Sequence, residues 1–84
     1  MRRKIAKRKR REILKHATII REYWVKHRDW KRKDWAYIVD VKCNGWMICA
    51  PGDDELEAYK AALECIETAE REPPFERNDE NENL

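Results

Sequence analysis

The dipeptide Asn44-Gly45 stands between two runs of alternating apolar residues, and it constrains the fold more than any other feature of this sequence. Both residue types accept the positive φ angles of a type I′ turn, which joins two antiparallel strands. Every second residue is apolar in residues 35–43 and again in residues 46–50, the period of a half-buried strand. The turn places Cys43 opposite Trp46, Val41 opposite Ile48 and Val39 opposite Ala50, all on one face. We therefore predict a two-stranded antiparallel β-hairpin over residues 35–51.

A helix is predicted directly after this hairpin. Pro51-Gly52 ends the second strand, and Asp53 is a good N-cap residue. Apolar residues then recur at helical spacing: Leu56, Tyr59, Leu63, Ile66 and Ala69. Pro73-Pro74 stops the pattern. Residues 53–72 are therefore expected to form an acidic amphipathic helix.

A longer helix is predicted before the hairpin. The residues Ile13, Ala17, Ile20, Trp24 and His27 are spaced by four, three, four and three, which is one stripe of a helix. No Pro or Gly occurs in residues 1–44, so we expect this helix to continue to about Lys31, with Trp24 on its core face. The predicted fold is α+β: a long basic N-terminal helix, a two-stranded hairpin and a C-terminal helix, in the order α-β-β-α.

The chain is short enough for one domain, which we place at residues 12–72. Residues 1–11 are expected to form a basic arm without core residues, so that its removal would leave the melting temperature nearly unchanged. Residues 73–84 are acidic and Asn-rich, and we expect a disordered tail there. A two-stranded sheet is marginal alone and has open edges, so a homodimer with a shared sheet is one expected arrangement.

Charge divides the chain into two halves of opposite sign. Residues 1–34 hold fifteen Lys or Arg against four acids, a net of +11, whereas residues 35–84 hold four against thirteen, a net of −9. Dense basic clusters attract phosphate backbones chiefly through counterion release, and tryptophans among them can stack on bases. The candidate contacts with DNA or RNA are Arg2, Arg3, Lys4, Lys7, Arg8, Lys9, Arg10 and Arg11 in a first run and Lys26, Arg28, Trp30, Lys31, Arg32 and Lys33 in a second.

Other interpretations of the charge remain open at this stage. The basic face can bind an acidic protein, keep the chain soluble, or be screened by the chain's own acidic half. A protein-interaction module, such as a phage-encoded inhibitor of a host or defence complex, is the alternative function. Its acidic helix would then mimic phosphates through Asp53, Asp54, Glu55, Glu57, Glu64 and Glu67. The phage comparison is an analogy from size and composition alone.

Several classes of function are not indicated. The residues His16, His27, Cys43, Cys49 and Cys65 lack the paired spacing of structural zinc ligands, so we expect no metal and three reduced thiols in an intracellular protein. The sequence contains no serine and no Gly-rich phosphate loop. We therefore expect neither an enzyme nor a cofactor or small-molecule substrate. No apolar stretch is long enough to span a membrane, and no membrane partner is expected.

Overall fold

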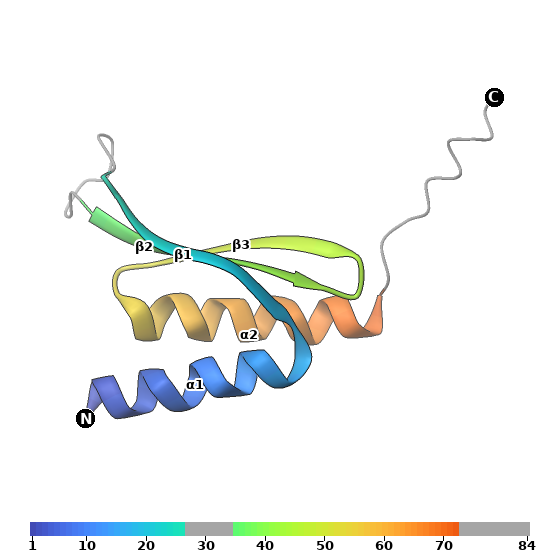
Figure 1. Cartoon of the computed structure of the whole chain (residues 1–84), viewed down its shortest axis with the longest axis horizontal. Coiled ribbons are helices and arrows are strands. Elements are labelled where there is room, and N and C mark those ends of the chain that lie inside the picture. The colour runs from blue at the N-terminus through green and yellow to red at the C-terminus, as the bar shows by residue number, and fades with distance from the viewer. Residues whose placement is uncertain (27–34, 73–84) are drawn as a thin grey trace.

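The protein folds into two helices and a three-stranded antiparallel sheet in a computed structural model that describes residues 1–26 and 35–72 (Figure 1). In chain order the elements are α1 (Arg2–His16), β1 (Thr18–Lys26), β2 (Trp35–Cys43), β3 (Trp46–Gly52) and α2 (Glu55–Arg71). The strand order in the sheet is β1-β2-β3, so β2 is the central strand. The predicted α+β class is confirmed, with one strand more than expected.

The hairpin formed by β2 and β3 has the predicted register. Its strands pair Val39 with Ala50, Val41 with Ile48 and Cys43 with Trp46. The turn residues Asn44 and Gly45 have φ angles of 51° and 86°, both in the left-handed region that a type I′ turn requires. This part of the fold follows from local turn chemistry and strand alternation.

The first helix is shorter than predicted. It ends at His16, and Thr18–Lys26, expected to continue the helix to about Lys31, forms β1 instead. Most residues of this strand are β-branched or aromatic and pack well on a pleated sheet. A register shift between Ile19 and Arg21 places Ile19, Glu22 and Trp24 on one face. Because such an irregularity breaks the two-residue period, the strand pattern is hidden in the sequence.

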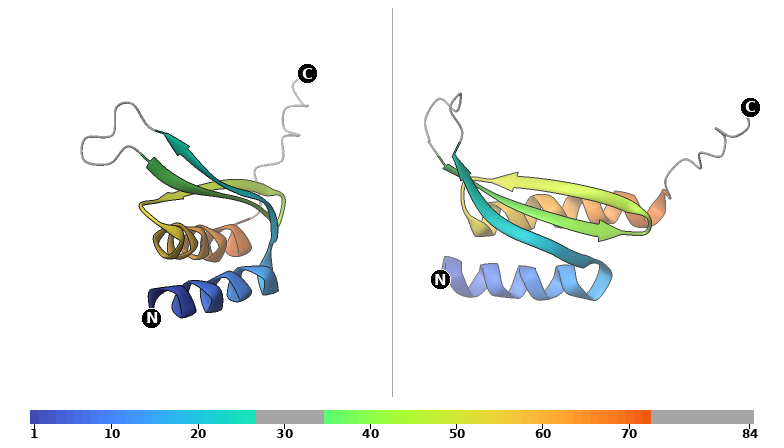
Figure 2. Two further views of the ribbon diagram at one scale, coloured as in Figure 1. Left: turned by 60° about the vertical axis from the view of Figure 1, so that its left-hand side comes forward. Right: turned by 45° about the horizontal axis from the view of Figure 1, so that its top comes forward.

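Both helices lie on the same face of the sheet (Figures 1 and 2). Helix α2 packs against β2 and β3, and α1 lies beside α2. The two helices run in the same direction, because Arg2 is hydrogen-bonded to Asp54 at their N-terminal ends and His16 contacts Glu70 near their C-terminal ends. The basic and acidic helices are therefore neighbours along their length.

The core lies between the sheet and the helices. Its buried members are Ala6, Ile13, Tyr37, Val39, Val41, Cys43, Ala50, Leu56, Ala58, Tyr59, Ala62, Ile66 and Ala69. Two residues predicted for the core are partly exposed instead. Trp24 is 48% exposed at the sheet edge, with its ring edge-on to Tyr37 at 5.0 Å between centroids. Trp46 is 39% exposed and donates its indole N–H to the carbonyl oxygen of Glu72 at 2.7 Å.

Residues 1–11, predicted as an arm, form the N-terminal part of α1 and reach the core. Ala6 is buried, and Ile5 packs against the core cluster. The premise that this segment contains no core residue is therefore wrong, and we now expect its removal to expose core surface and lower the melting temperature. The tail predicted for residues 73–84 lies outside the described residues.

The start of α2 is capped by Asp54 and not by the predicted Asp53. The Asp54 carboxylate accepts the backbone N–H of Glu57 at 3.0 Å, which satisfies one of the free donors of the first turn. Gly52 brings β3 close to this turn. A Cβ there would lie 2.7 Å from the Glu57 carbonyl carbon and 2.8 Å from the Ala58 Cα, so only glycine fits without movement of the backbone.

Candidate nucleic-acid interface

The outward face of α1 carries a stripe of positively charged residues. Ala6 and Ile13 point into the core, and the residues opposite to them on the helix are exposed. These residues recur at spacings of three and four, which aligns them along one face: Lys4, Lys7, Arg8, Arg11 and Lys15. We call this set the cationic stripe. Helix α1 forms an outer side of the molecule, so the stripe faces solvent (Figures 1 and 2).

The cationic stripe is unfavourable for the isolated helix. Like charges three or four residues apart repel each other. The first turn contains no acidic residue, although the N-terminal end of a helix favours negative charge. The described part of the chain also provides none of the five side chains with an ion-pair partner. An external polyanion would relieve all three effects.

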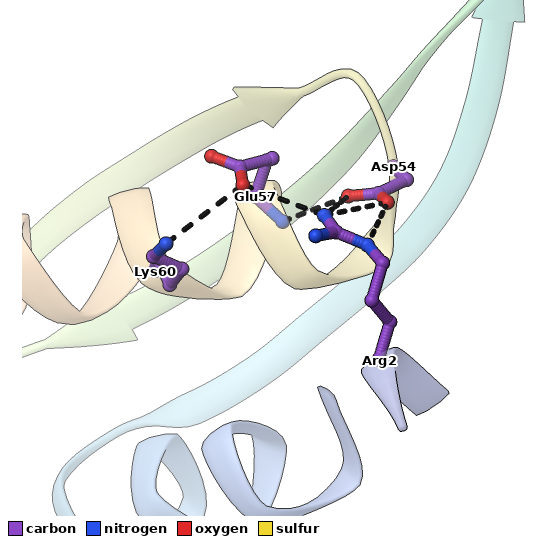
Figure 3. A network of polar contacts seen from close by, with 4 residues as sticks. All are labelled: Arg2, Asp54, Glu57 and Lys60. Carbon is purple, nitrogen blue, oxygen red and sulfur yellow. Dashed lines mark hydrogen bonds and ion pairs between the residues drawn. The ribbon is translucent and has the colours of Figure 1, made fainter. Parts of the chain in front are cut away.

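Two of the predicted phosphate contacts are occupied within the protein. Arg2 bonds the Asp54 carboxylate through Nε at 3.1 Å and Nη2 at 2.9 Å, and reaches Glu57 at 3.4 Å (Figure 3). Arg10 donates to Glu22 through Nε at 2.8 Å. The pKa of each guanidinium is raised, first of all by these hydrogen bonds. Arg2 and Arg10 therefore stabilise the packing of α1 and are not part of the outward face.

Arg3 and Lys9 lie at the margins of the stripe. Arg3 is exposed and lines a pocket of about 300 Å³ together with Trp24 and Leu56. Lys9 is half-buried. Lys15, in contrast, belongs to the stripe although sequence reasoning missed it. Lys15 follows Arg11 at a spacing of four residues, but the predicted basic arm ended at residue 11 and so left Lys15 out.

The second basic run falls mostly between the described residues. Arg28, Trp30, Lys31, Arg32 and Lys33 lie outside the described residues. Lys26, the remaining member, is exposed at the end of β1, where it pairs with the half-exposed Trp35 of β2. Both ends of this connection lie at the end of the molecule that carries the N-terminus of α1 (Figure 1).

Glu22 of β1 is an acidic residue on the core side of the sheet, which sequence reasoning did not single out. Its side chain is 15% exposed. It accepts hydrogen bonds from Arg10 of α1, from the Tyr37 hydroxyl of β2 at 2.9 Å, and from the Tyr59 hydroxyl of α2. One carboxylate thus joins four elements. The helical interpretation of residues 18–26 hid it, because it placed Glu22 away from the apolar stripe.

The protonation of this cluster follows from its contacts. Burial raises the pKa of Glu22, but the hydrogen bonds from Arg10, Tyr59 and Tyr37 outweigh burial and hold it below its usual range. Burial and the hydrogen bond to Glu22 raise the pKa of Tyr37 to about 12. The same two causes raise the pKa of Tyr59. Glu22 therefore stays ionised and both tyrosines stay neutral at physiological pH.

The acids proposed for the alternative function are distributed over α2 and the turn before it. Asp54 and Glu57 bond Arg2, and Glu57 also pairs with Lys60 at 3.8 Å (Figure 3). Asp53, Glu55, Glu64 and Glu67 are exposed. Lys60 and Arg71 are interspersed among the outward acids of α2, so this face has mixed charge. This mixed face is therefore a poor mimic of a phosphate backbone, whereas the cationic stripe has the charge needed to bind one.

Among the described residues, the three cysteines and His16 do not gather into a site, and His27 lies outside the described residues. All three cysteines have free thiols, and the buried Cys43 contacts the carbonyl oxygen of His16. Burial raises the pKa of Cys43 and of Cys49, which disfavours reactive thiolates. Within residues 1–26 and 35–72, no three potential ligands lie close enough to hold a metal ion. Neither described helix has the length and apolarity needed to cross a bilayer.

Comparison with known proteins finds no matching family model, no matching curated protein and no matching solved structure.

Proposed function

We propose that this protein is a small, non-enzymatic nucleic-acid-binding protein that contacts phosphates through the cationic stripe of α1. The observation that carries the proposal is the stripe itself: five exposed cations on one helical face, without acidic partners in the described chain. A surface that serves only solubility normally mixes both signs. On this face positive charge predominates despite its repulsion, and Glu12 is the one acidic residue of α1.

The dimensions of the stripe suit a nucleic-acid backbone. Lys4 and Lys15 are eleven residues apart, which corresponds to roughly 16 Å along a helix. Duplex DNA carries one charge per about 1.7 Å of its axis, and its major groove admits an α-helix. Flexible lysine and arginine side chains supply charge without a fixed pattern of base contacts. We therefore expect binding that depends little on sequence.

Binding should depend steeply on salt. Each neutralised phosphate contributes about −0.9 to the slope of log affinity against log salt on duplex DNA, and about −0.7 on single strands. Five stripe cations predict a slope of about −4 to −5 on duplex DNA. Fluorescence anisotropy of labelled duplex and single-stranded oligonucleotides, from low to physiological salt, measures this slope. No binding tighter than about 10⁻⁴ M at low salt would contradict the proposal and favour an acidic protein partner.

A matched pair of triple variants separates the stripe from overall charge. Replacing Lys4, Arg8 and Arg11 with Gln should weaken binding on every sequence and flatten the slope on duplex DNA by about 2.7. Replacing Lys42, Lys60 and Arg71 with Gln removes the same charge from β2 and α2 and should leave most of the slope. Equal losses in the two variants would show that net charge, and not the face of α1, determines binding.

A further inference from the structure

The two edges of the sheet are protected to different degrees. Edge strand β1 carries Arg21, Glu22 and Lys26 and contains a register shift, features that discourage pairing with another chain. Edge strand β3 has the sequence WMICAPG, without a charged residue. In the described chain its only partner is β2. The unprotected edge of this sheet is therefore β3.

The hairpin register determines which backbone groups of β3 point outward. The residues that flank a two-residue turn form a hydrogen-bonded pair, and such pairs then alternate along the ladder. Trp46, Ile48, Ala50 and Gly52 thus bond to β2. The free N–H groups of the outer edge belong to Met47 and Cys49, because the next outward residue is Pro51, which has no N–H. Pro51 therefore limits the edge to a short segment.

An apolar pocket lies beside this segment on the helix side of the sheet. It has a volume of about 350 Å³ and is lined by Trp46, Ile48, Glu64, Cys65, Thr68 and Ala69. Trp46 is 39% exposed, and on the opposite face of the strand Met47 is 64% exposed. The free backbone edge and the exposed apolar surface are thus adjacent.

We propose that β3 pairs with β3 of a second copy of this chain, in antiparallel orientation, to form one continuous six-stranded sheet. In the register that places Ile48 opposite Ile48 of the second copy, Met47 of each copy pairs with Cys49 of the other copy. All four available N–H groups of the two copies are then used, and Pro51 stays outside the pairing. The same register sets the large Trp46 opposite the small Ala50 and directs the second Ile48 toward the apolar pocket. The strand edge is thus self-complementary, and this inference does not depend on nucleic-acid binding.

The oligomeric state of the full chain tests the proposal. Sedimentation velocity should show a species of about twice the 10.2 kDa chain mass, with dissociation on dilution. Met47→Pro removes an N–H that points away from β2 and should produce the monomer. Met47→Gln changes the same exposed side chain but keeps the N–H, and it should remain a dimer. A monomeric wild-type protein at millimolar concentration, or two variants with the same mass, would overturn the proposal.

A cross-linking experiment tests the register without relying on a folded proline variant. In the background Cys49→Ser and Cys65→Ser, Ile48→Cys should form an intermolecular disulfide under mild oxidation, because paired residues on the symmetry axis lie within disulfide reach. Native Cys49 is two positions from its symmetry mate in this register, roughly 8 Å or more between Cα atoms, which is beyond that reach. Efficient cross-linking through Cys49 and none through position 48 would overturn the register.

Discussion

At the residue scale, the Glu22 cluster joins β1 to α1, β2 and α2 through one carboxylate. A half-buried carboxylate would otherwise keep bound water. Here the Arg10 guanidinium and the hydroxyl groups of Tyr37 and Tyr59 take the place of that water. Buried polar groups are costly when a partner is lost, because the remaining groups stay desolvated. Glu22 therefore positions α1 over β1 and so supports the orientation of the cationic stripe.

Replacing Glu22 tests this role. Glu22→Gln keeps the shape of the side chain but removes its charge and points an amide donor toward groups that themselves donate. We expect the free energy of unfolding to fall by about 1–3 kcal/mol. Glu12→Gln, at an exposed glutamate of α1, should change it by less than about 0.5 kcal/mol. Urea titration followed by tryptophan fluorescence measures both. Equal values for the two variants would contradict the role assigned to Glu22.

The same cluster predicts how stability depends on pH. The folded pKa of Glu22 is below its unfolded value, so its contribution is present above about pH 4.3 and is lost as the pH falls through the folded pKa. Tyr37 has the opposite sign: its folded pKa of about 12 exceeds the unfolded value near 10. Its contribution is complete below pH 10 and is lost as the pH rises toward 12.

The loss of stability at alkaline pH includes contributions from Tyr37 and Tyr59, whose pKa values are both raised, and a Tyr37→Phe variant separates the contribution of Tyr37. Between pH 10 and pH 12, ionisation of Tyr37 in the unfolded chain should lower the free energy of unfolding by about 2 kcal/mol. Tyr37→Phe cannot ionise, so its stability should fall less over this range. Denaturant titrations at several pH values compare the two proteins, with Tyr23→Phe as the control outside the cluster. A parallel decline in wild type and Tyr37→Phe would contradict the assignment.

At the element scale, α1 packs on the core through one face and carries the proposed binding surface on the other. Its inner face contributes Ala6 and Ile13 to the core, and its outer face repels itself. Helix α2 follows the usual rules, with an aspartate cap and acidic residues in its first turn. The contrast indicates that the outer face of α1 was not arranged for helix stability.

Charge reversal at the two ends of the stripe should separate stability from binding. Lys4→Glu places an acid in the first turn of α1 and pairs it with Arg8, whereas Lys15→Glu places an acid in the last turn, where the helix dipole disfavours it. Both lose the same charge, but Lys4→Glu should be the more stable by about 0.5–1 kcal/mol. Both should weaken nucleic-acid binding. Thermal unfolding at low salt measures the order, and the reverse order would contradict this account of α1.

At the scale of the whole molecule, the two proposed surfaces are independent. The cationic stripe lies on α1, and the self-complementary edge lies on β3, on elements that share no direct packing among the principal contacts of the fold. The basic and acidic halves of the chain meet between α1 and α2, through the pairs Arg2–Asp54 and His16–Glu70. This contact uses the acids near α1 and leaves the outer face of α1 available.

The sequence by itself determined the elements whose signals are local. The Asn44-Gly45 turn, the β2–β3 register and the apolar stripe of α2 depend on neighbours within a few residues, and all three agree with the structure. The basic composition of α1 was equally visible, but not which of its cations face solvent.

Only the tertiary structure decided the rest. Thr18–Lys26 becomes a strand because β2 offers a free edge beside it, and that pairing outweighs a helical spacing without turn or cap signals. Glu22 lies half-buried on the core side of the sheet because a register shift turns it toward Arg10, Tyr37 and Tyr59. The stripe separates from Arg2 and Arg10 only once α2 and β1 lie beside α1, where Asp54 bonds Arg2 and Glu22 bonds Arg10. Each of these outcomes depends on contacts between residues far apart in the chain, which a local pattern does not encode.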